Sequence, residues 1–95
     1  MASDRAAMVK VDPTVDLVVY GREECHLCEQ MIQALKAYQA RWSFDFQVID
    51  IDADSELVSR FNDKVPVLMS LSNQKEICRY YLDTAALDDY LANFR

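Results

Sequence analysis

The chain has 95 residues, of which 52% are hydrophobic and 27% charged, enough for one domain with a modest packed core. Its formal net charge of −6 argues against nucleic acid as a partner, because phosphate binding depends on clustered Lys and Arg. No apolar run approaches the roughly 20 residues that span a bilayer, so we expect no membrane association.

The first residues and the cysteine count bear on domain organisation and compartment. Residues 1–14 lack the continuous apolar segment of a secretory signal, so we expect a flexible leader there and one domain over residues 15–95. Three cysteines, an odd number, do not make the disulfide framework of a small secreted scaffold. We therefore expect a cytoplasmic protein, where a close CxxC is more often catalytic or metal-binding than structural.

The first half of the chain predicts a strand, a long helix and a second strand. The continuous apolar run 17–20 indicates a strand buried on both faces, which Gly21 closes. From Cys25, apolar residues recur every three or four positions and predict an amphipathic helix that reaches about Arg41. Residues 44–51, largely alternating apolar and polar, predict a second strand.

A short helix is expected next, beginning in an acidic stretch. Asp52, Asp54 and Ser55 are candidate caps, and Asn62-Asp63 breaks the helix. We interpret Asp50, Asp52 and Asp54 as solvated strand-end and capping residues, not as a metal site.

The last part of the chain predicts two strands and a final helix. Residues 66–71 and 75–81 read as strands joined by a turn at 72–74, and Asp83 or Thr84 can cap the helix. The element order is thus β-α-β-α-β-β-α. The first two strands should be parallel with a right-handed crossover, and the last two should form an antiparallel hairpin. The predicted fold is α/β, a four-stranded mixed sheet with helices on both faces.

The pair Cys25 and Cys28 falls at the start of the first predicted helix. A helix N-terminus offers unpaired N–H groups and a positive dipole end, which favour a thiolate over a thiol. Because the thiolate is the reactive species, Cys25 is the candidate nucleophile and Cys28 the candidate resolving thiol. His26 between them could stabilise the thiolate when protonated, or could be an exposed residue that leaves the sulfur open.

The run from residue 17 to about 94 resembles a glutaredoxin, of the thioredoxin-like superfamily. The match rests on CHLC at residues 25–28 after a buried strand, on the element order, and on Val65-Pro66 before the third strand. The resemblance implies that Pro66 follows a cis peptide bond and faces the cysteine pair. It also implies that the Val65 backbone can pair with a bound substrate.

The resemblance further implies a glutathione site, and this chain matches the family at some positions of that site but not at others. Arg22 matches a basic residue three positions before the first cysteine, and Asp83 matches the acidic residue that meets the glutathione amine. Typical members carry CPYC and a Gly-Gly pair before the last helix, whereas CHLC has no proline and residues 79–83 have no glycine. Lys64 stands where the family has the threonine of Thr-Val-Pro.

Acidic residues flank the cysteine pair on both sides. Glu23, Glu24 and Glu29, here called the acidic collar, adjoin the pair in sequence. Like charge disfavours a thiolate and repels anionic glutathione, while Arg22 and the helix dipole oppose that effect. The collar suits a protein disulfide beside basic residues better than it suits free glutathione.

These features predict a thiol–disulfide oxidoreductase in which Cys25 and Cys28 reduce protein disulfides or glutathione mixed disulfides. We expect a monomer with no tightly bound cofactor, with glutathione as a possible co-substrate. One alternative is a zinc or iron–sulfur module shared by a dimer, since one CxxC supplies too few ligands. Another is a non-catalytic adaptor with an unreactive Cys25. Cys78 is expected to be a buried strand residue.

Overall fold

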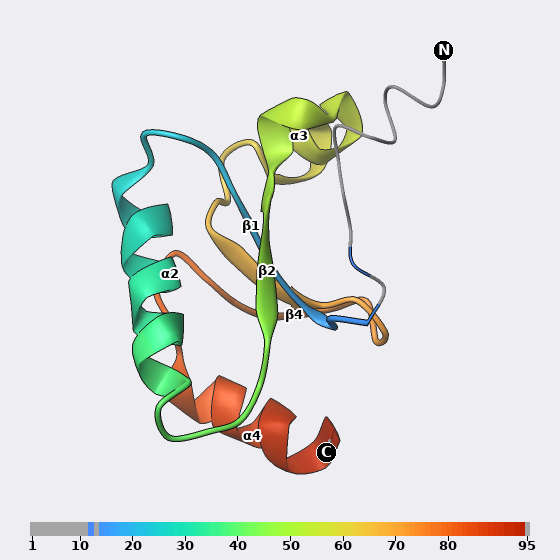
Figure 1. The fold of residues 1–95 in the computed structure, drawn as a ribbon. Helices are drawn as coiled ribbons and strands as arrows, with labels where there is room; N and C mark the ends of the chain where they lie inside the picture. The colour runs from blue at the N-terminus through green and yellow to red at the C-terminus, as the bar shows by residue number, and fades with distance from the viewer. Residues whose placement is uncertain (1–11, 13, 95) are drawn as a thin grey trace.

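A four-stranded mixed sheet forms the centre of the molecule in the computed structural model, which describes residue 12 and residues 14–94 (Figure 1). The strand order is β2-β1-β3-β4. The strands are β1 (Leu17–Gly21), β2 (Phe46–Asp50), β3 (Val67–Ser70) and β4 (Lys75–Arg79). β1 pairs parallel with β2 and antiparallel with β3, and β3 pairs antiparallel with β4. The predicted mixed sheet is confirmed.

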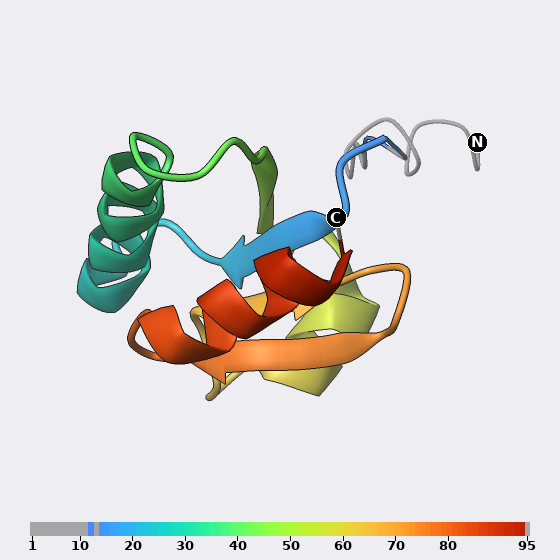
Figure 2. The ribbon, with the colours of Figure 1, turned by 90° about the horizontal axis from the view of Figure 1, so that it is seen from below.

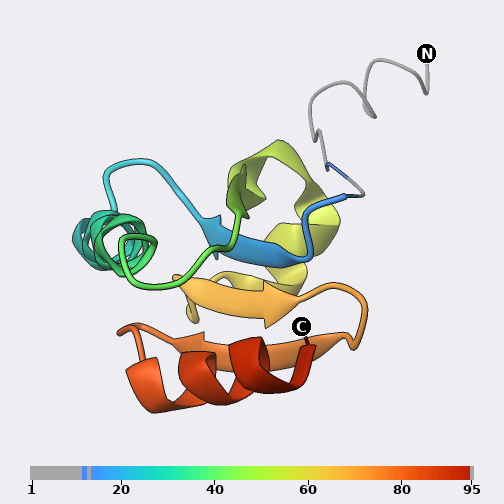
Figure 3. The same ribbon diagram turned by 60° about the horizontal axis from the view of Figure 1, so that its bottom comes forward.

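Helices cover both faces of this sheet. They are α2 (His26–Tyr38), α3 (Ser55–Phe61) and α4 (Thr84–Phe94), and a short 3₁₀ helix, η1 (Ile51–Ala53), precedes α3. The views from below place α2 and α4 on one side of the strands and α3 on the other (Figures 2 and 3). The predicted element order β-α-β-α-β-β-α is therefore confirmed.

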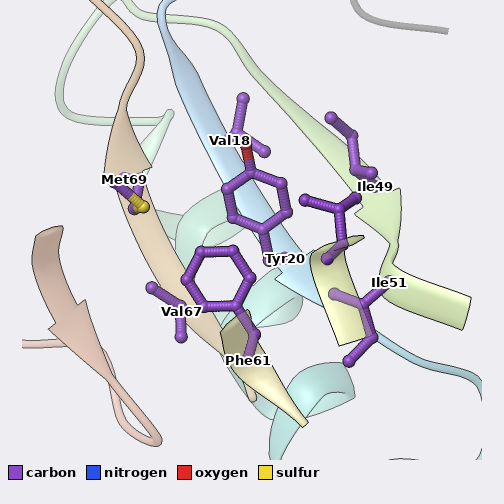
Figure 4. Packing of buried hydrophobic residues seen from close by; sticks show 8 residues of the cluster. Val18, Tyr20, Ile49, Ile51, Phe61, Val67 and Met69 are labelled. Atoms are coloured by element: carbon purple, nitrogen blue, oxygen red, sulfur yellow. The ribbon is translucent and has the colours of Figure 1, made fainter. Parts of the chain in front are cut away.

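Two apolar cores lie on the two faces of the sheet, and β1 contributes to both. Because successive side chains of a strand point to opposite faces, Val18 and Tyr20 face α3, while Leu17 and Val19 face α2 and α4. On the α3 side the Tyr20 ring stacks on Phe61, with centroids 4.7 Å apart (Figure 4). All five residues of β1 are buried, as the apolar run predicted.

A polar network around the buried Ser70 joins neighbouring elements at the start of β1. The Asp16 carboxylate accepts hydrogen bonds from the Ser70 hydroxyl (2.5 Å), the Tyr90 hydroxyl (2.6 Å) and the Ser72 backbone N–H (2.7 Å). Burial acts to raise the pKa of Asp16, but these hydrogen bonds outweigh it and leave the pKa below its usual range. We call these four residues the Asp16 network. It fastens β1 to β3 and α4.

The elements end earlier than the sequence predicted at several points. α2 ends at Tyr38, not near Arg41, because residues 40 and 41 turn back with hydrogen bonds to the carbonyls three residues before them. β2 covers 46–50 in place of 44–51, because Ile51 starts the 3₁₀ helix. β3 covers 67–70, where 66–71 was expected.

β4 also ends early, at Arg79, where the sequence predicted 75–81. Tyr80 leaves the extended conformation with φ 70°, and its N–H bonds the Pro66 carbonyl at 2.8 Å. A non-glycine residue in this left-handed region breaks the run of strand geometry.

The predicted leader, residues 1–14, lies largely outside the described residues. Of its two described members, Asp12 exchanges backbone hydrogen bonds with the Gln47 side chain on β2, and Thr14 bonds the Asp12 carboxylate. Within the described part of the chain, no helix is both long and apolar enough to cross a membrane.

Candidate active site

Cys25 is the N-cap residue of α2. Its backbone is extended (φ −111°, ψ 109°), and its Sγ accepts a hydrogen bond of 3.1 Å from the Cys28 backbone N–H. Its carbonyl accepts the first helical bond, from Glu29 N–H at 3.1 Å. The sulfur thus occupies the position in which a capping oxygen normally satisfies an orphan N–H group.

The two cysteines are joined in a disulfide, with Cα atoms 5.1 Å apart. Cys25 is half-buried, while Cys28 is only 3% exposed. Of the two cysteines, Cys25 is therefore the more accessible from outside the protein.

The loop between β1 and α2 brings the chain to this position. It leaves the upper end of β1 and crosses to the first turn of α2 (Figure 1). Glu24, just before Cys25, has φ 58°, a conformation that non-glycine residues rarely adopt. This turn lets Cys25 take the extended N-cap geometry, from which the helix begins.

Gly21 makes room for the second sulfur. A Cβ atom at Gly21 would lie 3.1 Å from the Cys28 Sγ and 3.4 Å from its Cβ. Gly21 ends β1, as predicted, but its approach to Cys28 was not predicted. The available signal was its uniqueness: the chain has one glycine, four residues before the CxxC.

His26 is the first residue of α2 and its side chain is exposed. The imidazole makes no hydrogen bond or ion pair with the residues that the structure describes. An exposed side chain next to Cys25 in the sequence fits both roles considered for it, and its contribution to catalysis stays a prediction.

Val65 and Pro66 carry the cis peptide bond that the resemblance implied. Pro66 is fully buried, and its carbonyl is bonded by Tyr80 N–H at 2.8 Å. The Val65 N–H and carbonyl make no hydrogen bond with any described residue. They are therefore available to an extended substrate segment, the role predicted for this residue.

Arg22 is held by two partners within the protein. Its guanidinium donates two hydrogen bonds to the Asp52 carboxylate, at 2.9 and 3.2 Å. It donates two more to Asn62, to the carbonyl at 3.1 Å and to Oδ1 at 3.0 Å. Hydrogen bonding to Arg22 lowers the pKa of Asp52. Substrate binding, the role predicted for Arg22, is untested, and its two partners, which lie 30 and 40 residues away in the chain, were not predicted.

Asp83 caps α4, as one of the two predicted alternatives had it. Its Oδ1 accepts the Ala86 N–H at 3.1 Å.

Cys78, on β4, is half-buried and forms no disulfide. Burial raises the pKa of the Cys78 thiol, with a hydrogen bond from the Asp83 backbone in partial opposition. Cys78 is thus a packed strand residue, though less buried than expected.

The acidic collar is exposed, and its carboxylates make no hydrogen bond or ion pair with described residues. Of the acidic residues at and after the end of β2, Asp50 caps η1 and Asp54 caps α3, in line with their interpretation as strand-end and capping residues. Asp52, a candidate cap, instead pairs with Arg22. Among the residues that the structure covers, no three His, Cys, Asp or Glu side chains gather as ligands for one metal ion.

Fold and site together define the class. A four-stranded mixed sheet, a CxxC at the start of the helix after β1, and a cis proline before β3 make this a glutaredoxin-like protein with the thioredoxin-like fold. The sequence model of the glutaredoxin-like domain (DUF836) matches residues 16–92. The chain therefore belongs to this family.

Solved structures support the assignment. Protein Ne2328 from Nitrosomonas europaea, solved by NMR in solution, is 46% identical over 86% of this chain and 95% of its own, with a TM-score of 0.73. The X-ray structure of target protein XcR50 from X. campestris is 36% identical over 80% of this chain and 95% of its own, with a TM-score of 0.64. No curated protein matches the chain.

Proposed function

We propose that this protein is a thiol–disulfide oxidoreductase whose working groups are Cys25 and Cys28. The observation that carries the proposal is the hydrogen bond from Cys28 N–H to the Cys25 sulfur at the N-terminus of α2. In the reduced protein the same N–H group and the helix dipole would stabilise a thiolate at Cys25. His26, when protonated, would add to that stabilisation.

The reaction proceeds by two exchanges. The Cys25 thiolate attacks one sulfur of a substrate disulfide, forms a mixed disulfide with it, and releases the other sulfur as a thiolate, which takes a proton from water. Cys28 then loses its proton and attacks the Cys25 sulfur, which forms the Cys25–Cys28 disulfide and releases the second substrate thiolate. Two electrons pass from the dithiol to the substrate. An external thiol reductant, with glutathione as one candidate, restores the dithiol.

The substrate is a disulfide-containing or glutathionylated protein. The free backbone groups of Val65 beside buried Pro66 would pair with an extended segment of it. Arg22 and Asp83 are both engaged in the protein, so we assign them to holding the loop before Cys25 and the start of α4 in place.

Trapping tests the proposal. The Cys28→Ser variant, challenged with an oxidised peptide disulfide, should accumulate one mixed disulfide at Cys25, because the second exchange is blocked. The Cys25→Ser variant is the matched control and should form no adduct at Cys28. Peptide mapping by mass spectrometry locates the adduct.

Three results would contradict the proposal. They are no adduct in the Cys28→Ser variant, an adduct confined to Cys78, and iron or zinc bound between two chains of freshly purified wild-type protein. The last would favour the metal module, and an unreactive Cys25 would favour the adaptor.

A further inference from the structure

A mostly apolar groove of about 210 Å³ opens beside the resolving cysteine, between α2 and the edge strand β2. Its apolar lining includes Cys28, Ile32 of α2 and Val48 of β2. Val48 is 49% exposed, although its neighbour in the sheet, Val19, is fully buried on the same face. α2 therefore leaves part of that face uncovered next to the redox pair.

The rim of the groove is acidic. Glu23 and Asp50 both line it, and the one basic lining residue is Arg22. Two of the four hydrogen bonds from Arg22 go to the Asp52 carboxylate, which offsets part of its positive charge, and Asp50 also interacts electrostatically with Arg22. Glu23 makes no hydrogen bond or ion pair with the described residues, and Asp50 accepts one hydrogen bond, from the Asp52 backbone N–H at 2.9 Å. These two carboxylates outnumber the one guanidinium in the lining and give the groove a negative charge beside its apolar residues.

We propose that this groove binds a Lys or Arg side chain of a substrate protein, close in sequence to the disulfide cysteine that Cys25 attacks. Long basic side chains pair an aliphatic stem with a charged head. The stem would lie on Val48 and Ile32, and the head would contact Glu23 and Asp50. This inference rests on the proposed function and adds its substrate class: protein disulfides flanked by basic residues, in preference to anionic glutathione.

The test uses three peptides of equal length that carry one cysteine as a 2-pyridyl disulfide. Lys, Gln or Glu flanks the cysteine, and the glutathione 2-pyridyl disulfide is a fourth substrate. Release of 2-thiopyridone gives the rate with reduced protein, and the rate that remains in Cys25→Ser is subtracted. The Lys peptide should react about tenfold faster than the Glu peptide at low salt, since each exposed charge contact contributes a factor of about two to five.

Two variants place the effect in the groove. Glu23→Gln combined with Asp50→Asn should reduce the Lys-to-Glu rate ratio to about two, because only weaker, longer-range attraction is left. Asn keeps the oxygen that caps η1. The matched control is Glu56→Gln on α3, on the opposite face of the sheet, which removes an exposed carboxylate and should leave the ratio unchanged. High salt should reduce the wild-type ratio in the same way.

The outcomes separate this inference from the proposed function. If the Gln peptide reacts through Cys25 but the Lys and Glu peptides react equally, the groove proposal is wrong and the oxidoreductase stands. Equal losses in the groove variant and in Glu56→Gln would also overturn the groove proposal, as would a faster reaction with the glutathione substrate than with the Lys peptide. If no peptide reacts through Cys25, both proposals fail.

Discussion

The carboxylates near the two ends of the central strand β1 differ in whether they are hydrogen-bonded within the protein. At its start, the Asp16 carboxylate accepts three hydrogen bonds from β3, the following turn and α4. At its end, the acidic collar carries carboxylates that make no such contacts with the described residues. A charge satisfied within the protein stabilises the fold, while an exposed, unpaired charge is available to a partner. The contrast predicts that substitutions at one end change stability and those at the other change reactivity.

Asp16→Ala should have the largest effect on stability. It leaves the Ser70 hydroxyl, in a residue 1% exposed, without its charged acceptor, and should lower the free energy of unfolding by about 2–3 kcal/mol. Denaturant unfolding measures this. The rate of Cys25 disulfide exchange in the folded variant should stay within about twofold of wild type, since the network has no part in the chemistry.

Asp45→Ala is the matched control, because Asp45 is exposed and makes no hydrogen bond with described residues. It should change the unfolding free energy by less than about 0.5 kcal/mol. A loss of exchange activity in Asp16→Ala without a loss of stability would break the contrast between the two ends.

Gly21→Ala should change both the free energy of unfolding and the rate of disulfide exchange, because Gly21 ends β1 and lies against the resolving cysteine. The added Cβ would lie 3.1 Å from the Cys28 sulfur. We therefore expect the free energy of unfolding to fall by about 1–2 kcal/mol and the Cys25–Cys28 disulfide to close more slowly. Stopped-flow release of the second product measures closure. In a Cys28→Ala background the stability cost should shrink, because the crowded sulfur is gone. An unchanged cost there would place the strain elsewhere.

Acid should lower the free energy of unfolding through Asp16, by less than Asp16→Ala or Gly21→Ala does. The folded-state pKa of Asp16 is below the ordinary value of 3.8, so its stabilisation is present above pH 3.8 and is lost as the pH falls through the lower folded value. Unfolding free energies at a series of acidic pH values should fall more steeply in wild type than in Asp16→Asn, which cannot ionise. Parallel curves would show that Asp16 does not carry this dependence.

The sequence predicted those parts of the fold that depend on local pattern. The apolar run 17–20 identified β1, and the change of period at Cys25 placed the start of α2 within one residue. The ends were less certain, because tertiary contacts set them. β4 stops where Tyr80 turns to bond the Pro66 carbonyl, a contact that no spacing in 75–81 contains.

The same limit applies to the candidate site. The positions of both cysteines follow from the sequence, because both depend only on where the first turn of α2 begins. The engagement of Arg22 with Asp52 and Asn62 depends on segments that meet only in the folded chain. The groove beside Val48 likewise exists only because α2 stops short of covering β2. These features carry the substrate inference, and the linear pattern did not contain them.

The pH dependence of Cys25 alkylation in the reduced protein tests the central claim most directly. Mass spectrometry follows the rate at Cys25 and, as an internal reference, at half-buried Cys78. The account predicts a midpoint for Cys25 below the value of about 8.5 for free cysteine, and alkylation at pH 7 about tenfold or more faster than at Cys78. A Cys25 midpoint at or above that of free cysteine, or faster reaction at Cys78 at pH 7, would contradict it.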